Sequence, residues 1–344
     1  MNFFGMLPNI TAGPIEALEN SPSLVGVGNA NEGQDDEIMF NVLLDQGWSE
    51  TELDTEKYFH DFVTARYSDG RADERKIPQE IYKAWDILRT AVYNYSHSTV
   101  GIPTFEDVLL TMVPKSPIGQ SPSLELKNEL RYDPTEMVKA WSLLLKGGLF
   151  HESAYRFDLV QFTRQVLEDA FSLTLPSLQS KYKNGAPASE FMPIARKLLL
   201  IIKSMDAVLM TEKSLRLSEW TSAARAWGSG DKDLADYFEQ NARSQVTHWA
   251  PNEGPLNDYS QRSWGGLVSG YYYPRWSIFV DYLESTPAEE YDQTELREKL
   301  WPMESEWIMK TSDGDAAAVA SGGDGLRDVL EGLKRDLGDI FVVD

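Results

Sequence analysis

From about residue 50 onward, apolar residues recur every three to four positions, which is the spacing of one face of an α-helix. The first such segment, 54–67, shows the pattern in Tyr58, Phe59, Phe62, Val63 and Tyr67. Further segments of this kind span 78–95, 133–148, 154–175, 189–211, 217–228 and 231–249. Only residues 23–28 have the character of a short strand. The pattern therefore predicts a mainly α fold, with a large all-helical domain behind a short mixed piece.

Three parts of different character follow one another along the chain. Residues 1–47 combine the strand candidate with a helical pattern that starts at Ile38. Residues 48–310 carry the helical period and form the predicted all-α domain. Residues 311–344 are an acidic tail that begins with a stretch poor in bulky side chains. We expect this tail to be partly flexible, with a short amphipathic helix near its end.

The chain is strongly acidic, with 54 Asp and Glu against 32 Lys and Arg and a net charge of −22. A surface of this sign repels phosphate backbones, so we expect no nucleic-acid partner. The sequence has no cysteine, and its four histidines lack ligand spacing. We therefore expect neither a metal centre nor another cofactor. No apolar run approaches the ~20 residues that cross a bilayer, so no membrane span is expected.

A cluster of acidic residues follows the strand candidate. Asp35, Asp36 and Glu37 directly precede the helical pattern, where carboxylates favour the positive end of the helix dipole. Glu32 is separated from them by Gly33 and Gln34, and it lies just past the end of the candidate strand. Barrel enzymes place catalytic carboxylates at such a position. Two interpretations of Glu32 remain open at this point, namely a solvated charge and a catalytic group.

The segment 248–276 places many aromatic residues among Pro, Gly and Asn. Trp249 and Tyr259 lie in or beside its loop, where a ring face can stack on a sugar. Trp264 and Tyr271 are better explained as core residues of a helix. Arg275 is expected either to pair with a carboxylate such as Asp258 or to be structural.

Several long motifs resemble the α-N-acetylglucosaminidase family and occur in the family's order. They are "SLVGVGNANEGQDDE", "DPTEMVKAWSLLL", "YRFDLVQFTRQVLEDAF", "DYFEQNARSQVTHWAP" and "LNDYSQRSWGGLVSGYYYPRW". The resemblance runs from about residue 10 to 285, and the tail after about 290 does not contribute. It implies the C-terminal all-helical domain, preceded by a remnant of the last strand and helix of a (β/α)8 barrel within 1–47.

The resemblance also implies an activity. Family members are retaining glycoside hydrolases that remove terminal α-linked N-acetylglucosamine from glycans, heparan sulfate in animal members. One carboxylate attacks the anomeric carbon and a second acts as acid and then base. The position that matches the family's nucleophile is Glu32, although Asn31 stands where the family has proline. Trp249 and Tyr259 match the helical domain's contacts to the sugar.

The acid/base glutamate of the family lies in a barrel segment that precedes everything present here. The resemblance therefore implies a fragment that is inactive alone, with residues 1–30 poorly held because a single barrel strand lacks neighbours. Family members reach lysosomes, vacuoles or the extracellular space. Asn9 and Asn94 lie in glycosylation sequons that fit this route, although no signal peptide is evident.

A standalone helical module that binds a glycan or a protein partner without catalysis is the alternative to an enzyme fragment. It predicts a folded product in which Trp249 supports sugar binding while no bond is cleaved. The oligomeric state stays open in both hypotheses.

Overall fold

The computed structural model describes residues 3, 5–28, 37–68, 77–95, 116–127, 130–249, 257–311 and 323–341. Within these ranges every regular element is a helix, and β pairing is limited to two isolated bridges. The chain divides into two compact units. Unit 1 comprises Met1–Pro114, Glu129–Val166 and Phe341–Asp344, and unit 2 comprises Lys115–Asn128 and Leu167–Ile340. The mainly α fold predicted from the apolar spacing is confirmed.

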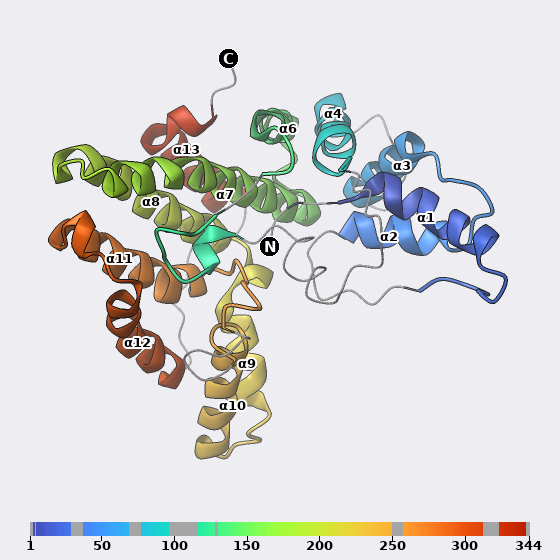
Figure 1. The fold of residues 1–344 in the computed structure, drawn as a ribbon. Helices are drawn as coiled ribbons and strands as arrows, with labels where there is room; N and C mark the ends of the chain where they lie inside the picture. Colours follow the sequence, from blue (N-terminus) through green and yellow to red (C-terminus); the bar gives the residue numbers. More distant parts are fainter. Residues whose placement is uncertain are drawn as a thin grey trace. The chain divides into compact units, whose positions relative to one another are not determined.

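Unit 1 is built from helices that pack in pairs (Figure 1). They are α1 (Leu7–Asn20), α2 (Glu37–Gln46), α3 (Thr55–Tyr67), α4 (Gln79–Ile87), a π-helical turn (Leu88–Val92), α6 (Pro134–Gly147) and the first part of α7 (Ser153–Lys183). Helix α1 packs on α2, α3 on α4, and α4 on α6. The helices bury Val63, Trp85, Trp141 and Phe162.

Local sequence explains where α6 begins and ends. Asp133 accepts a hydrogen bond from the backbone N–H of Thr135, and Pro134 occupies the first turn, where its missing N–H has no cost. Gly148 ends the helix with φ +71°, a left-handed conformation that glycine adopts without strain. The helix therefore begins and ends within the segment 133–148 that the apolar spacing predicts.

The first thirty residues depart from the sequence-based expectation in two ways. Residues 24–28 form no strand, and Val25 is 98% exposed. A strand needs a neighbour for its backbone hydrogen bonds, and the described residues offer this segment none. In contrast, α1 is well held, because Leu7 is buried and its N–H donates to the carbonyl of Tyr93 at 2.8 Å. The expectation of a poorly held N-terminus is therefore wrong for α1.

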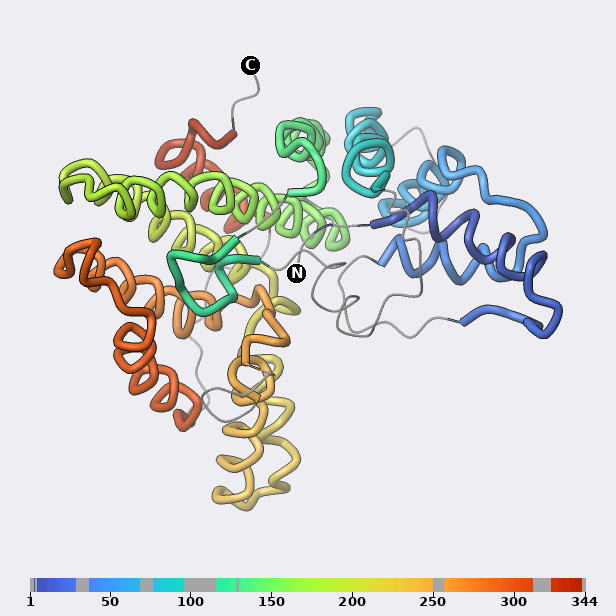
Figure 2. Tube along the Cα trace, viewed as in Figure 1, coloured from blue at the N-terminus to red at the C-terminus, as the bar shows by residue number. Residues whose placement is uncertain are grey.

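Within the described ranges, unit 2 holds the second part of α7 together with further α-helices (Figure 2). These are α8 (Ala188–Leu209), α9 (Leu217–Ala226), α10 (Lys232–Gln245), α11 (Tyr273–Ser285), α12 (Gln293–Met309) and α13 (Gly323–Asp336), with a π-helical turn at Val268–Tyr272. Helices α9 and α10 form a hairpin, α10 packs on α12, and α11 packs on both α8 and α12. No helix in the described ranges is long and apolar enough to cross a membrane.

The end of the acidic tail is ordered by an amphipathic helix, as predicted. Leu326, Leu330 and Leu333 lie on one face of α13 and are buried, and α13 packs on α8. Lys197 of α8 adds an ion pair with Asp339 at 2.5 Å. Residues 312–322 lie outside the described ranges. The predicted boundaries at 47 and 310 stay predictions, while the boundary between the two compact units along the chain falls within α7, between Val166 and Leu167.

Candidate functional site

The structure brings two of the three predicted site residues together. The rings of Trp249 and Tyr259 lie 6.1 Å apart between centroids, inclined at 51°. Trp249 is 47% exposed and Tyr259 is half-buried, so the pair presents aromatic surface to solvent. Glu32, the predicted nucleophile, lies outside the described residues.

An irregular backbone at the end of α10 carries this aromatic pair. Trp249 has φ +41°, and its N–H donates to the carbonyl of Ser244 at 2.7 Å. Asp258, directly before Tyr259, has φ +56°, and its N–H donates to the carbonyl of Thr247 at 2.9 Å. Non-glycine residues rarely adopt positive φ unless surrounding contacts hold them there. The backbone on the two sides of residues 250–256 is thus joined by the hydrogen bond between Asp258 and Thr247.

A buried ion cluster includes Asp258 and His248, the neighbours of Tyr259 and Trp249. Arg275 of α11 donates from both terminal nitrogens to Asp258, at 2.9 and 2.8 Å, which confirms the pairing proposed from the sequence. The Nε atom of Arg275 lies 2.8 Å from Oε1 of Glu304, a carboxylate of α12 that is 0% exposed. The two parallel hydrogen bonds between Arg275 and Asp258 fix the relative orientation of these two side chains.

Three more side chains complete the cluster around Glu304. Its Oε2 atom lies 3.1 Å from Nε2 of His248 and 2.7 Å from a terminal nitrogen of Arg297. The other ring nitrogen of His248 lies 2.9 Å from Oδ1 of Asn257. Burial by itself would raise the pKa of Glu304, but the hydrogen bond with His248 and the charges of Arg275 and Arg297 outweigh it and lower this pKa to about 2. Glu304 is therefore ionised near neutral pH.

The sequence-based search missed Glu304. A signal was present, because Leu296, Leu300, Glu304 and Trp307 follow helical spacing and all four are buried. A single carboxylate within an apolar helical stripe indicates a buried partner of opposite charge. That partner could not be named from the sequence alone.

Of the two aromatic residues of segment 248–276 that the sequence predicts to be core residues, one is buried and one is not fully buried. Tyr271 is fully buried, as expected for a core residue. Trp264 is half-buried and lies 5.9 Å from the ring of Trp220, which is itself partly exposed. Trp264 is therefore less enclosed than a core residue.

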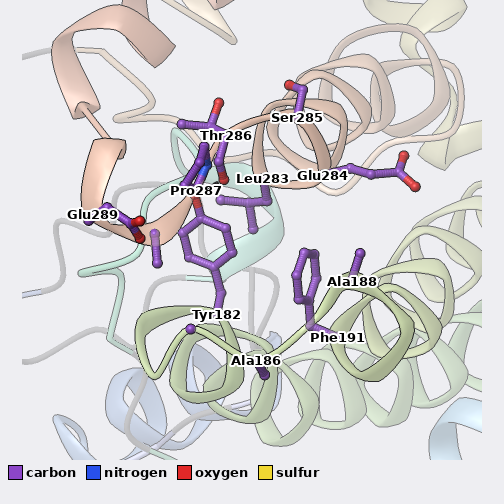
Figure 3. A pocket seen from close by; sticks show the side chains of 12 residues that line it. Tyr182, Ala186, Ala188, Phe191, Leu283, Glu284, Ser285, Thr286, Pro287 and Glu289 are labelled. Atoms are coloured by element: carbon purple, nitrogen blue, oxygen red, sulfur yellow. Dashed lines mark hydrogen bonds between the residues drawn. The ribbon is translucent and has the colours of Figure 1, made fainter.

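Unit 2 also contains a pocket of about 300 Å³ between the junction of α7 with α8 and the end of α11 (Figure 3). Tyr182, Phe191 and Leu283 form its apolar wall, and the carboxylates of Glu284 and Glu289 lie at its edge. Neither Trp249 nor Tyr259 lines it. The pocket is therefore distinct from the aromatic pair.

The two predicted glycosylation positions are both exposed. Asn9 lies on α1, and Asn94 follows the π-helical turn of unit 1. Exposure leaves room for a glycan at either asparagine, and modification at both stays a prediction.

Comparison with known proteins identifies the family. The family model for the C-terminal domain of alpha-N-acetylglucosaminidase matches residues 58–331, which is well over half of the chain. This protein therefore belongs to the alpha-N-acetylglucosaminidase family through that domain. The match continues to 331, so the sequence-based expectation that the resemblance ends near 285 is too short.

Individual relatives agree with this assignment. Human alpha-N-acetylglucosaminidase is 28% identical over 313 residues, which cover 89% of this chain and 40% of the human protein. The family 89 glycoside hydrolase from Clostridium perfringens in complex with PUGNAc has a TM-score of 0.79 at 24% identity, covering 96% of this chain and 37% of that one. The same hydrolase with its substrate GlcNAc-alpha-1,4-galactose gives the same values. The chain thus spans about two fifths of the length of these relatives and shares their fold.

Proposed function

We propose that this chain is the sugar-contacting helical part of an α-N-acetylglucosaminidase, a retaining glycoside hydrolase acting on glycans with terminal α-linked N-acetylglucosamine. The pairing of Trp249 with Tyr259 on the irregular end of α10 is the observation that carries the proposal. Family membership supports it, and the Clostridium perfringens relative has been solved with a substrate bearing this sugar.

Each residue of the pair has a defined task in the proposal. The exposed indole of Trp249 stacks on the C–H face of the sugar, which excludes water from that face. The phenol of Tyr259 adds a second apolar wall and a hydroxyl that can exchange hydrogen bonds with the sugar. Both contacts bind and orient the sugar without taking part in bond cleavage.

Bond cleavage in the proposal depends on two carboxylates. Glu32 is the nucleophile that attacks the anomeric carbon and forms the glycosyl-enzyme intermediate. The acid/base carboxylate belongs to the catalytic barrel of the intact enzyme, of which residues 1–47 are the final piece. A nucleophile without this partner loses the proton transfer to the leaving oxygen. We therefore propose that the 344-residue chain does not hydrolyse glycosides by itself.

Sugar binding by the chain tests the first half of the proposal. Isothermal titration with methyl α-N-acetylglucosaminide at millimolar concentration is expected to show binding that Trp249→Ala abolishes. Trp227→Ala is the matched control, because Trp227 is 74% exposed and its ring contacts Phe238, away from Tyr259. Absence of binding by the wild-type chain, or equal loss in both variants, contradicts the proposal.

Hydrolysis tests the second half and separates the enzyme fragment from the standalone module. In a longer family protein that contains this sequence, Glu32→Gln is expected to abolish release of p-nitrophenol from its α-N-acetylglucosaminide. Asp35→Asn, three residues on at the start of the helical pattern, is expected to retain turnover. Wild-type turnover by the Glu32 variant contradicts the assignment. Binding without any turnover in the longer protein favours the module instead.

We also propose passage through the secretory pathway to a lysosome, a vacuole or the cell exterior. The exposed sequon residues Asn9 and Asn94 support this route. Expression in a eukaryotic secretory host should add mass that endoglycosidase treatment removes, and the double variant with Gln at both positions should lack it. Equal mass of wild type and variant contradicts modification.

A further inference from the structure

The aromatic pair has an unusual attachment to the fold. Trp249 and Tyr259 approach each other from the two ends of segment 250–256, and neither lies on a regular helix. Trp249 itself and Asp258, the neighbour of Tyr259, both have positive φ. Backbone of this kind persists only where other contacts over-determine it. The contacts of the residues next to Trp249 and Tyr259 therefore bear directly on where the two rings lie.

A residue of α12, Glu304, is linked to the neighbours of both rings. Glu304 reaches the Trp249 end through His248, whose Nε2 lies 3.1 Å from Oε2. It reaches the Tyr259 end through Arg275, which binds Asp258 with both terminal nitrogens. One fully buried carboxylate thus meets the residue that precedes Trp249 and, through one guanidinium, the residue that precedes Tyr259.

Opposite charges hold this link in place. Arg297 lies 2.7 Å from Oε2 of Glu304, so the carboxylate has a basic partner on three sides. The low pKa of Glu304 agrees with a carboxylate that stays ionised. Charge-assisted hydrogen bonds are shorter and stronger than neutral ones, and opposite charges attract strongly in a low-dielectric interior, so the cluster favours one arrangement.

We propose that Glu304 is a positioning residue that sets the separation and inclination of Trp249 and Tyr259, and thereby the affinity of this site for N-acetylglucosamine. The positioning of the rings stands on the contacts above. Its consequence for the sugar rests on the proposed function of the pair.

The test needs a variant that removes the charge of Glu304 and keeps the volume of its side chain. The control should lose the charge of another buried carboxylate, so that both variants lose stability for the same reason. Glu304→Gln is the variant. Glu239→Gln is the control, because Glu239 is also 0% exposed and also pairs with two arginines of unit 2, Arg225 and Arg243. Both variants remove one buried negative charge, and the arginine partners of Glu239 lie on α9 and α10.

The first readout reports ring placement without any sugar. The full chain labelled with 5-fluorotryptophan contains ten tryptophans, and the ¹⁹F signal of Trp249 is identified by its absence in Trp249→Phe. We expect Glu304→Gln to shift and broaden this signal, and Glu239→Gln to leave it unchanged. The proposal is overturned if the Trp249 signal shifts equally in both variants, or if it does not shift in Glu304→Gln. If Glu304→Gln does not fold, Glu304→Asp keeps the charge, withdraws the carboxylate and has the same expected shift.

The second readout is affinity for methyl α-N-acetylglucosaminide. Glu304→Gln is expected to weaken it ~10-fold, the size expected for loss of a charge-assisted contact, while Glu239→Gln stays near wild type. The two proposals fail differently. A wild-type chain that binds no sugar, but whose Trp249 signal moves with Glu304→Gln, refutes the sugar site and keeps the positioning role. Normal sugar binding with an unmoved signal refutes the positioning role alone.

Discussion

Asp158 in unit 1 and Glu304 in unit 2 are both buried carboxylates on long helices, and both bind arginine, yet their pKa values move in opposite directions. Burial raises the pKa of Asp158, and its contacts with Arg66 and Tyr67 only partly oppose this. The pKa of Glu304 falls to about 2 although this carboxylate is buried as well. The difference shows that basic partners around a buried carboxylate can outweigh the effect of burial on its pKa.

The partner geometry explains the contrast. Asp158 accepts hydrogen bonds from two nitrogens of Arg66, at 2.5 and 2.8 Å, and from the hydroxyl of Tyr67 at 2.6 Å. Arg66 also donates to Glu37, so its charge is shared between two acids. Glu304 instead has two arginines and a histidine around one carboxylate. Unit 1 therefore holds an acid-rich cluster, whereas the cluster of Glu304 has enough basic groups to keep the acid charged.

Removal of each carboxylate should give the largest effect and the clearest difference. Glu304→Ala leaves buried Arg275 without one of its acids, so we expect a loss of ~3–5 kcal/mol in unfolding free energy. Asp158→Ala should cost less, ~1–3 kcal/mol, because Arg66 keeps Glu37. Urea unfolding followed by circular dichroism measures both. A cost for Asp158→Ala that matches or exceeds that of Glu304→Ala would break the comparison.

Acidification should change the contributions of the two carboxylates to folding stability in opposite directions. The folded pKa of Glu304 is about 2 and its ordinary value is 4.5, so its stabilisation is complete above pH 4.5 and is lost as pH falls toward 2. This difference corresponds to ~3 kcal/mol. Asp158 has a raised pKa and contributes no such loss on acidification.

Unfolding free energies measured between pH 5 and pH 2.5 check this expectation. Glu304→Gln should flatten the acid-induced loss of stability, and Asp158→Asn should make it steeper, because the raised pKa of Asp158 favours the folded state on acidification. A slope that is unchanged in Glu304→Gln would show that other carboxylates account for acid sensitivity.

A smaller effect is expected from one hydroxyl of the unit 1 cluster. Tyr67 donates to Asp158 and accepts from the indole nitrogen of Trp85 at 2.9 Å. Tyr67→Phe leaves two buried polar groups short of a partner, so we expect a loss of ~1–2 kcal/mol by urea unfolding. Tyr58→Phe is the control, because its hydroxyl contacts Asp45 at an exposed site and should cost little. Equal costs would argue against buried Tyr67 as a special member of the cluster.

The smallest effects should come from helix caps, and they should not differ between the units. Asp54 accepts from the N–H of Lys57 in unit 1, and Asp231 accepts from Asp233 and Leu234 in unit 2. Substitution of either cap by alanine is expected to cost ~1 kcal/mol by urea unfolding. If one cap costs several times the other, the units differ in more than their buried clusters.

The aromatic pair and the cluster beneath it differ in how visible they are in the sequence. Trp249 and Tyr259 are conspicuous because polar-tipped rings occur in a turn-rich segment. Glu304 is one acid among 54, and its contact with His248 spans 56 positions. A composition or motif search cannot detect such a pairing, since nothing near either residue specifies the other.

The helices and the strand expected over 23–28 show the same contrast between local features, which the sequence reveals, and features that depend on distant residues. The apolar period and the caps of segments such as 133–148 depend on residues within a few turns, so the sequence determined them directly. Helix α1 lies in a part of the chain for which the apolar spacing predicts no helix, and it is held by contacts with α2 and with Tyr93. The strand over 23–28 was expected from local propensity but lacks a partner.

By itself, then, the sequence determined the helical class, the starts and stops of the well-patterned helices, the acidic balance and the aromatic residues suited to a sugar. Tertiary structure alone decided that Trp249 meets Tyr259, that Asp158 and Glu304 differ in pKa, and that residues 24–28 stay irregular. The physical reason is range. Helical hydrogen bonds join residues four apart, whereas ion clusters and strand ladders need partners whose distance along the chain is unrelated to their distance in space.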